Sequence, residues 1–204
     1  MAAVPDADAS PQVRLVSRAG TDLTVRKDGR KGSYQCGVAD VPGRWDHWPS
    51  GMVYCAPLEE SARGVLVIRP GDVLLGSSRH ASSEVRLTFR DGLIIDISGG
   101  PDALQTETYL RTVGDEGSRR IAHVGWGTDH RADWRHVGMD SESLYGSVTV
   151  GLGRNTFDSP APHCGLGGRN RSKTHFDICL RGVSVYLDGA LVVDAGRFVP
   201  EELA

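Results

Sequence analysis

Residues 84–97 read EVRLTFRDGLIIDI, and they carry the clearest signal for secondary structure in the chain. Apolar and polar side chains alternate over residues 84–90, with the period of two that marks a half-buried β-strand. Asp91 and Gly92 follow, and a second β-rich run occupies residues 93–97. Because an Asp-Gly pair between two such runs favours a tight turn, the stretch predicts an antiparallel hairpin.

Outward from this hairpin, the sequence continues as short strand-like runs between turns. A second hairpin with Asp-Gly at its turn is expected from residues 183–187 and 191–194. Residues 101–113 form the best helix, with proline at the start, and residues 119–124 fit a short helix or a strand. The predicted class is therefore α+β with β dominant. Further strand-like runs are residues 23–26, 52–56, 65–69, 143–150 and 174–180.

The composition is that of an ordinary globular protein of 204 residues, with 39% hydrophobic and 24% charged residues. The formal net charge is -3 without a basic block, so a nucleic-acid partner is not expected. No run approaches the roughly 20 apolar residues of a membrane span, so no membrane partner is expected either. We expect a disordered leader over residues 1–12 and a single domain over residues 13–204.

The four cysteines are scattered, and no two have the C-x-x-C spacing of a zinc knuckle or redox pair. Scattered cysteines in a chain of this size fit a reducing compartment. The first residues lack a basic start followed by an apolar run, so they do not predict a signal peptide. The predicted location is the cytoplasm.

The first candidate site is the pair His175 and Asp177 in the strand-like run 174–180. Residues two apart on a strand point to the same face, so an imidazole and a carboxylate would lie side by side. An isolated H-x-D is a weak signal, because an edge-strand histidine beside a solvated aspartate gives the same pattern. The pair therefore needs support from a second segment.

That support comes from His123, which lies in the glycine-rich stretch AHVGWGTD, residues 122–129. Closely spaced glycines let the backbone approach another group tightly, although a turn with a buried histidine would also fit. Two histidines and one carboxylate with open positions suit non-haem iron(II). The same ligands can hold zinc, so they do not choose the metal by themselves.

A third segment, residues 42–51, places His47 between Trp45 and Trp48 in a loop bounded by proline and glycine. A packed turn whose tryptophans fill the core would fit this pattern. The functional interpretation is a pocket wall for a flat substrate, with His47 as proton donor or acceptor. Together with Trp126, the two loop tryptophans are our candidates for the apolar walls of that pocket.

The three segments together resemble the family that holds the M29-type metallo-aminopeptidases and the 2,5-dihydroxypyridine 5,6-dioxygenases. The resemblance covers nearly everything after residue 12, and it implies a barrel-like or mixed-sheet catalytic domain with few short helices. The matching pieces run in order as residues 19–23, 45–57, 65–72, 85–100, 123–129, 146–155, 167–168, 175–177, 185–189 and 196–198.

The two branches of this family differ at the metal. The aminopeptidase branch binds two ions, and its further ligands would fall at Met52, His123 and Thr149, which carry other residue types here. Two divalent ions with so few anionic ligands would be poorly neutralised. The dioxygenase branch has a histidine like His123, keeps the H-x-D, and has the aromatic loop with its histidine. Near Gly151 it carries a polar side chain, which this chain lacks.

Resemblance to the dioxygenase branch implies a metal site of His123, His175 and Asp177 that holds Fe(2+), with a small aromatic substrate and O2. The alternatives are an M29-type aminopeptidase with Zn2+ or Co2+, and a non-catalytic remnant that acts as a binding module. The family's N-terminal α/β portion is expected to be absent here. The exposed apolar surface left behind would favour a homo-oligomer.

Overall fold

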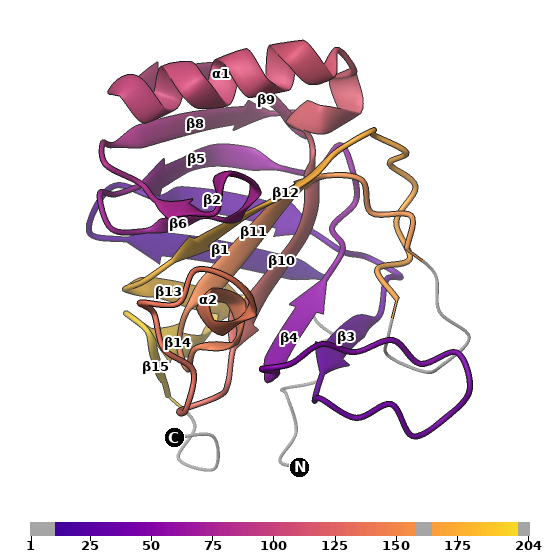
Figure 1. The fold of residues 1–204 in the computed structure, drawn as a ribbon. Coiled ribbons are helices and arrows are strands. Elements are labelled where there is room, and N and C mark those ends of the chain that lie inside the picture. The colour runs from indigo at the N-terminus through magenta and orange to yellow at the C-terminus, as the bar shows by residue number, and fades with distance from the viewer. Residues whose placement is uncertain (1–10, 158–164, 200–204) are drawn as a thin grey trace.

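The computed structural model describes residues 11–157 and 165–199, which fold mainly into short strands (Figure 1). None of the helices in these ranges is both long and apolar enough to cross a membrane. The helices are α1 (Pro101–Val113) and α2 (Met139–Ser143), with the 3-10 turns η1 (Leu75–Ser77) and η2 (Glu116–Arg119). The strands are β1 (Gln12–Ser17), β2 (Asp22–Arg26), β3 (Gly32–Gln35), β4 (Met52–Cys55), β5 (Arg63–Ile68), β6 (Val73–Leu74), β7 (Arg79–His80), β8 (Val85–Arg90), β9 (Leu93–Gly99), β10 (Ile121–Gly127), β11 (Val148–Gly153), β12 (His175–Leu180), β13 (Val183–Leu187), β14 (Ala190–Asp194) and β15 (Arg197–Phe198).

The strands form two sheets. One has the order β15-β14-β13-β1-β2-β5-β8-β9, and the other has the order β3-β4-β10-β11-β12-β6-β7. The pairs between these named strands are antiparallel. The β-dominant class with few helices is confirmed, and the sheets are open rather than closed into a barrel. Two open sheets are enough to form a hydrophobic core, because each sheet buries one face against the other.

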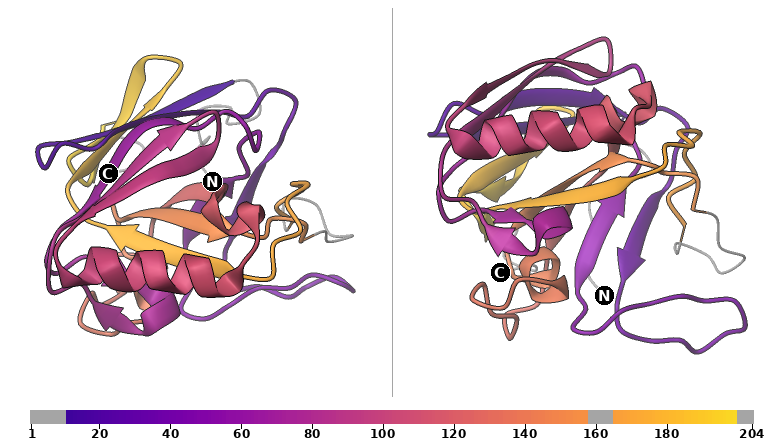
Figure 2. Two further views of the ribbon diagram at one scale, coloured as in Figure 1. Left: turned by 90° about the horizontal axis from the view of Figure 1, so that it is seen from above. Right: turned by 45° about the horizontal axis from the view of Figure 1, so that its top comes forward.

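The hydrophobic core lies between the sheets. Leu15 and Leu87 of the first sheet belong to the same buried cluster as Val124 and Ile178 of the second. Helix α1 packs along β8 and β9, and Leu110 is part of that core (Figure 2). The inner face of the second sheet is therefore committed to packing, and its outer face is left for other uses.

Both Asp-Gly hairpins are confirmed. In each turn the Asp and the Gly have positive φ, 49° and 80° at Asp91 and Gly92 and 47° and 85° at Asp188 and Gly189. This is the geometry of a type I′ turn, whose twist matches that of the flanking strands. Helix α1 also has its predicted bounds.

Three sequence-based assignments need correction or refinement. The strand expected over residues 143–150 begins only at Val148, because Ser143 closes the short helix α2. The ambiguous run 119–124 is largely strand, since β10 starts at Ile121. Gln12 already belongs to β1, so regular structure begins inside the expected leader.

Candidate metal centre

The candidate site lies on the outer face of the second sheet, across β10, β11 and β12. Strand β12 shows the alternation that places it there. Phe176 and Ile178 are buried in the core, whereas His175 and Asp177 point to the opposite face. The H-x-D spacing thus puts its two side chains on one face, as we predicted.

The register of the strands brings His123 to the same place. His123 on β10 pairs with Gly151 on β11, and Gly151 pairs with Asp177 on β12. The three residues form one row across the sheet, with no side chain in the middle. A Cβ on Gly151 would lie 2.4 Å from Cδ2 of His123 and 2.7 Å from Oδ1 of Asp177. The glycine is therefore what allows the outer two side chains to meet.

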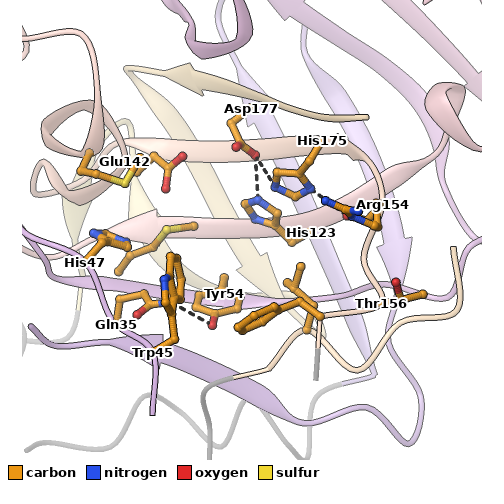
Figure 3. Close-up of a pocket in the computed structure, with 14 residues that line it drawn as sticks. Gln35, Trp45, His47, Tyr54, His123, Glu142, Arg154, Thr156, His175 and Asp177 are labelled. Atoms are coloured by element: carbon orange, nitrogen blue, oxygen red, sulfur yellow. Dashed lines mark hydrogen bonds and ion pairs between the residues drawn. The ribbon is translucent and has the colours of Figure 1, made fainter. Parts of the chain in front are cut away.

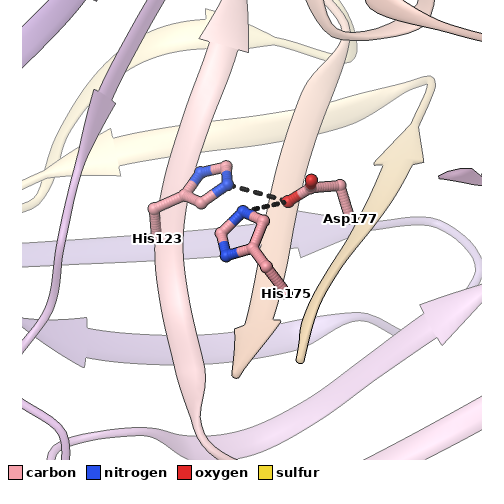
Figure 4. Close-up of side chains that lie close together, drawn as sticks. All are labelled: His123, His175 and Asp177. Atoms are coloured by element: carbon pink, nitrogen blue, oxygen red, sulfur yellow. Dashed lines mark hydrogen bonds and ion pairs between the residues drawn. The ribbon is translucent and has the colours of Figure 1, made fainter. Parts of the chain in front are cut away.

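The two histidine side chains converge on one carboxylate oxygen of Asp177 (Figure 4). Oδ1 of Asp177 lies 2.8 Å from Nε2 of His123 and 3.1 Å from Nε2 of His175. The two imidazole rings are nearly parallel, with an interplanar angle of 14° and centroids 5.2 Å apart. One ligand atom from each residue lies within 4.8 Å of the others. A divalent cation fits this donor set of two imidazoles and a carboxylate.

A hydrogen bond fixes the orientation of one ligand. Nδ1 of His175 lies 2.7 Å from the backbone oxygen of Arg154. Because a carbonyl only accepts, Nδ1 carries the proton, and the lone pair of neutral His175 is on Nε2, which faces the cluster. Such outer partners set the tautomer of metal-binding histidines. Nδ1 of His123 is buried and makes no hydrogen bond within the described residues.

The cluster is electrostatically coupled. Burial opposes ionisation of Asp177, but its hydrogen bonds with His123 and His175 outweigh burial and hold its pKa well below the usual range. Burial also opposes the charged form of His175, yet contact with Asp177 raises its pKa. Nearby, burial raises the pKa of Glu142 to about 8, and the charge of Asp177 adds to this effect. The site thus keeps Asp177 ionised and ready to bind a cation.

A pocket of about 490 Å³ opens directly over the cluster. This volume lies in the range of roughly 300–1,000 Å³ that is typical of small-molecule sites. Figure 3 shows Gln35, Tyr54 and Trp45 across the pocket from the cluster, with His47 and Glu142 beside it. The loop with His47 and the strand with His123 therefore line one pocket.

His47 is held in place by its own loop. Oδ1 of Asp46 accepts a hydrogen bond from the backbone N–H of His47, and Oδ2 accepts one from the N–H of Cys36. Nδ1 of His47 lies 2.7 Å from the oxygen of Pro49, so Nδ1 donates and Nε2 is left as the second ring nitrogen. The histidine lines the pocket without belonging to the cluster of potential metal ligands.

The three candidate tryptophans lie in different environments. Trp45 lines the pocket and packs edge-on against Phe157, with centroids 5.5 Å apart. Trp48 is 73% exposed and is not among the lining residues. Trp126 is 4% exposed and lies in the core. It is three residues from His123 on one strand, so the two side chains point to opposite faces. Trp48 and Trp126 therefore do not line this pocket.

Several lining residues were not foreseen from the sequence. Tyr54 could have been found, because it alternates with Val53 on a predicted strand. Gln35, Phe157 and Glu142 carry no local signal, and Glu142 sits on α2, a helix that we did not predict. The long loop before β12 also contributes, since Leu166 lines the pocket. His163, in the same loop, lies outside the described residues.

Comparisons with known proteins point to one family. The model of the NicX family, 2,5-dihydroxypyridine 5,6-dioxygenase, matches residues 1–200. The 2,5-dihydroxypyridine 5,6-dioxygenase of Pseudomonas putida KT2440 is 36% identical over 196 residues, which cover 91% of this chain and 54% of that protein. The solved structure of 2,5-dihydroxypyridine dioxygenase from Pseudomonas putida KT2440 superimposes with a TM-score of 0.87 at 33% identity, covering 97% of this chain and 57% of that one.

A second solved structure, wild-type AmpT from Thermus thermophilus, gives a TM-score of 0.69 at 18% identity, over 95% of this chain and 51% of that one. At this identity the likeness concerns the fold alone. The chain spans a little over half the length of each of these relatives. The match of the family model over nearly the whole chain, together with the 36% identical relative, confirms the resemblance. The chain belongs to the NicX family, 2,5-dihydroxypyridine 5,6-dioxygenase.

Proposed function

We propose that this chain is the catalytic part of a ring-cleaving dioxygenase that holds one iron(II) ion on His123, His175 and Asp177. The substrate is 2,5-dihydroxypyridine or a closely related hydroxylated ring. The convergence of two Nε2 atoms on one carboxylate oxygen carries the proposal. Two histidines and one carboxylate form the ligand set of many non-haem iron(II) oxygenases. Family membership supports the same reaction.

When bound, iron(II) supplies the electron-transfer chemistry that lets O2 react with an aromatic ring. The protein's own residues have three tasks. Trp45 and Phe157 provide an aromatic wall for a flat ring. His47 faces the pocket with Nδ1 committed to Pro49, so Nε2 is the atom that takes a hydroxyl proton from the substrate. The pocket holds the ring beside the cluster and limits the access of water.

The two-metal aminopeptidase is the competing hypothesis. Met52, which stands where that branch would place an acidic ligand, lines the pocket with an apolar side chain. Among the described residues, Asp177 is the single carboxylate in the cluster of potential ligands. These observations favour one ion over two, and a two-zinc or two-cobalt enzyme would contradict them.

The experiment is anaerobic loading of the purified chain with iron(II), followed by oxygen uptake with a panel of dihydroxypyridines and dihydroxybenzenes. We expect uptake with 2,5-dihydroxypyridine and loss of the ring's absorption band. Zinc- and cobalt-loaded samples with aminoacyl substrates are the matched comparison. Peptide hydrolysis without oxygen uptake would contradict the dioxygenase.

We further propose that the chain is a homo-oligomer. Trp48, Trp45 and Phe157 are 73%, 52% and 42% exposed, respectively, and Trp45 contacts Phe157 at the mouth of the pocket. Exposed aromatic clusters of this kind favour contact with another chain. Light scattering tests the proposal: a mass close to that of one 21.9 kDa chain at all concentrations would contradict it.

A further inference from the structure

Glu142 is a buried carboxylate in the pocket that the mechanism above does not use. It lies on α2, is 6% exposed, and lines the same pocket as His175 and Asp177 (Figure 3). Its backbone oxygen accepts a hydrogen bond from Ser147, but its carboxylate has no hydrogen bond or ion pair with any described residue. A buried acidic group without a partner is costly, so its presence calls for a reason.

Other buried carboxylates in the described part of the chain show what a structural role looks like. Asp102 accepts hydrogen bonds from the backbone N–H groups of Ser82 and Ser83 at 2.6 and 2.7 Å. Asp72 accepts from the N–H of Arg69 at 2.7 Å. Both are satisfied by the fold itself. Glu142 differs because its acceptor oxygens face the pocket and await a donor from outside the fold.

The missing partner of Glu142 is not the metal ion of the proposed centre. The ligand atoms that lie within 4.8 Å of one another come from His123, His175 and Asp177, and Glu142 is not in that group. It does border the same pocket, so a small molecule placed beside the cluster can reach it. Across the pocket, Oε1 of Gln35 is a second buried acceptor that has no partner. A ligand with hydrogen-bond donors on its edge would satisfy both.

We infer that Glu142 is a substrate-binding residue that accepts a hydrogen bond from a donor on the edge of the ring. The inference rests on the proposed function and deepens it. A dihydroxypyridine offers two kinds of donor, its hydroxyl groups and, in the pyridone form, the ring N–H. A dihydroxybenzene offers hydroxyl groups only. Glu142 therefore sets which rings bind, and a ring without a donor on that edge is rejected because the carboxylate would stay unpaired.

The test compares Glu142→Leu and Glu142→Gln with the unchanged chain, all loaded anaerobically with iron(II). Binding of 2,5-dihydroxypyridine and of 1,4-dihydroxybenzene is measured without O2. Leaving the ring's donor unpaired in a buried pocket should raise the Kd of the Leu variant about 10-fold to 100-fold. The Gln variant, which keeps a neutral acceptor, should fall between. Weaker binding of both rings identifies a hydroxyl donor, and weaker binding of the pyridine alone identifies the ring N–H.

Three further measurements separate this role from others. Iron content should be equal in all variants, and loss of iron from Glu142→Leu would overturn the inference by making Glu142 a metal ligand. The melting temperature should not fall in Glu142→Leu, because a partnerless carboxylate is replaced by an apolar group. Glu60→Gln, the same type of change at an exposed site, should leave binding unchanged.

The outcomes also distinguish the inference from the proposed function. If the unchanged chain binds neither ring, the proposed function fails and the inference fails with it. If the unchanged chain binds 2,5-dihydroxypyridine and both Glu142 variants bind it within twofold of that affinity, the proposed function stands and the inference alone is wrong.

Discussion

Gly151 is the residue on which the geometry of the cluster depends most. It occupies the middle of the row that joins His123 to Asp177, and a side chain there would overlap both. The family resemblance drew attention to this position only as a missing polar group. The register of the three strands, which a single sequence does not reveal, shows that a side chain at Gly151 would overlap its neighbours.

We therefore predict that Gly151→Ala disrupts the metal centre. The added Cβ would lie 2.5 Å from Nε2 of His123, so the imidazole must move away from Asp177. Iron affinity should fall at least 10-fold, with a loss of roughly 1–3 kcal/mol in stability from overpacking. Thr149→Ala is the control, because Thr149 lies two residues away on the same face of β11. Equal iron affinity in Gly151→Ala and in the unchanged chain would show that the row tolerates a side chain.

At the same scale, His47→Ala should keep its iron and lose turnover. His47 lines the pocket but is not part of the ligand cluster, and general acid–base groups contribute roughly 100- to 10,000-fold to rate. The exposed neighbour Trp48 provides a control in the same loop, since Trp48→Ala should leave both quantities nearly unchanged. Metal analysis and oxygen uptake measure the two effects. Loss of iron from His47→Ala would assign His47 to the metal instead.

At the scale of elements, local sequence patterns predicted the features that depend mainly on neighbouring residues. The two hairpins follow from Asp-Gly turns, and the helix 101–113 follows from its proline start and glycine end. Trp126 was assigned to a pocket wall because residues 119–124 fitted a helix or a strand and no element was predicted at residue 126. Strand β10 includes Trp126, and the period of two places its side chain in the core. Helix α2 was missed because only five residues form it.

Glu59 shows how one side chain joins several elements. One oxygen pairs with Arg30 at 2.5 Å, and the other accepts hydrogen bonds from the backbone N–H of Arg169 at 2.7 Å and from Asn155 at 3.2 Å. It thus ties the turn before β3 to the long loop that precedes β12. Burial opposes its ionisation, but these partners lower its pKa from 4.5 to about 2.

We predict that Glu59→Gln lowers the free energy of unfolding by roughly 1–3 kcal/mol at pH 7. Because the pKa is lower in the folded state, the contribution of Glu59 is complete above its unfolded value near 4.5 and is lost as the pH falls toward 2. Urea unfolding of both proteins at pH 7 and pH 3 should show a smaller difference at pH 3. A difference that grows in acid would contradict this assignment, and Glu60→Gln should have little effect at either pH.

At the scale of the whole molecule, two open sheets leave one face of the second sheet free for chemistry. The sequence predicted most of the longer strands and brought forward the three candidate ligands, but it did not show which strands are neighbours. Pairing of β10, β11 and β12 joins residues that are far apart in the chain, and it is decided by packing of the whole core. The outcome is that His123 and His175, more than fifty positions apart in the numbering, stack against each other.

Because the cluster spans three strands of one sheet, metal binding should stabilise the whole fold. Iron(II) at 100 times its Kd should add about 2.7 kcal/mol to the free energy of unfolding, provided that the unfolded chain binds none. The urea midpoint should rise with iron(II) and return to its starting value with a chelator. Asp177→Asn should show no such rise. An iron-induced shift of equal size in that variant would place the ion elsewhere.

One iron ion held jointly by His123, His175 and Asp177 can be tested by the metal content of the anaerobically loaded chain. The content is measured beside His175→Ala and Asp177→Asn after removal of loosely bound ions. We expect about one iron per unchanged chain and almost none in either variant, with all three proteins folded by circular dichroism. Two ions per chain, or unchanged iron in both variants, would contradict it.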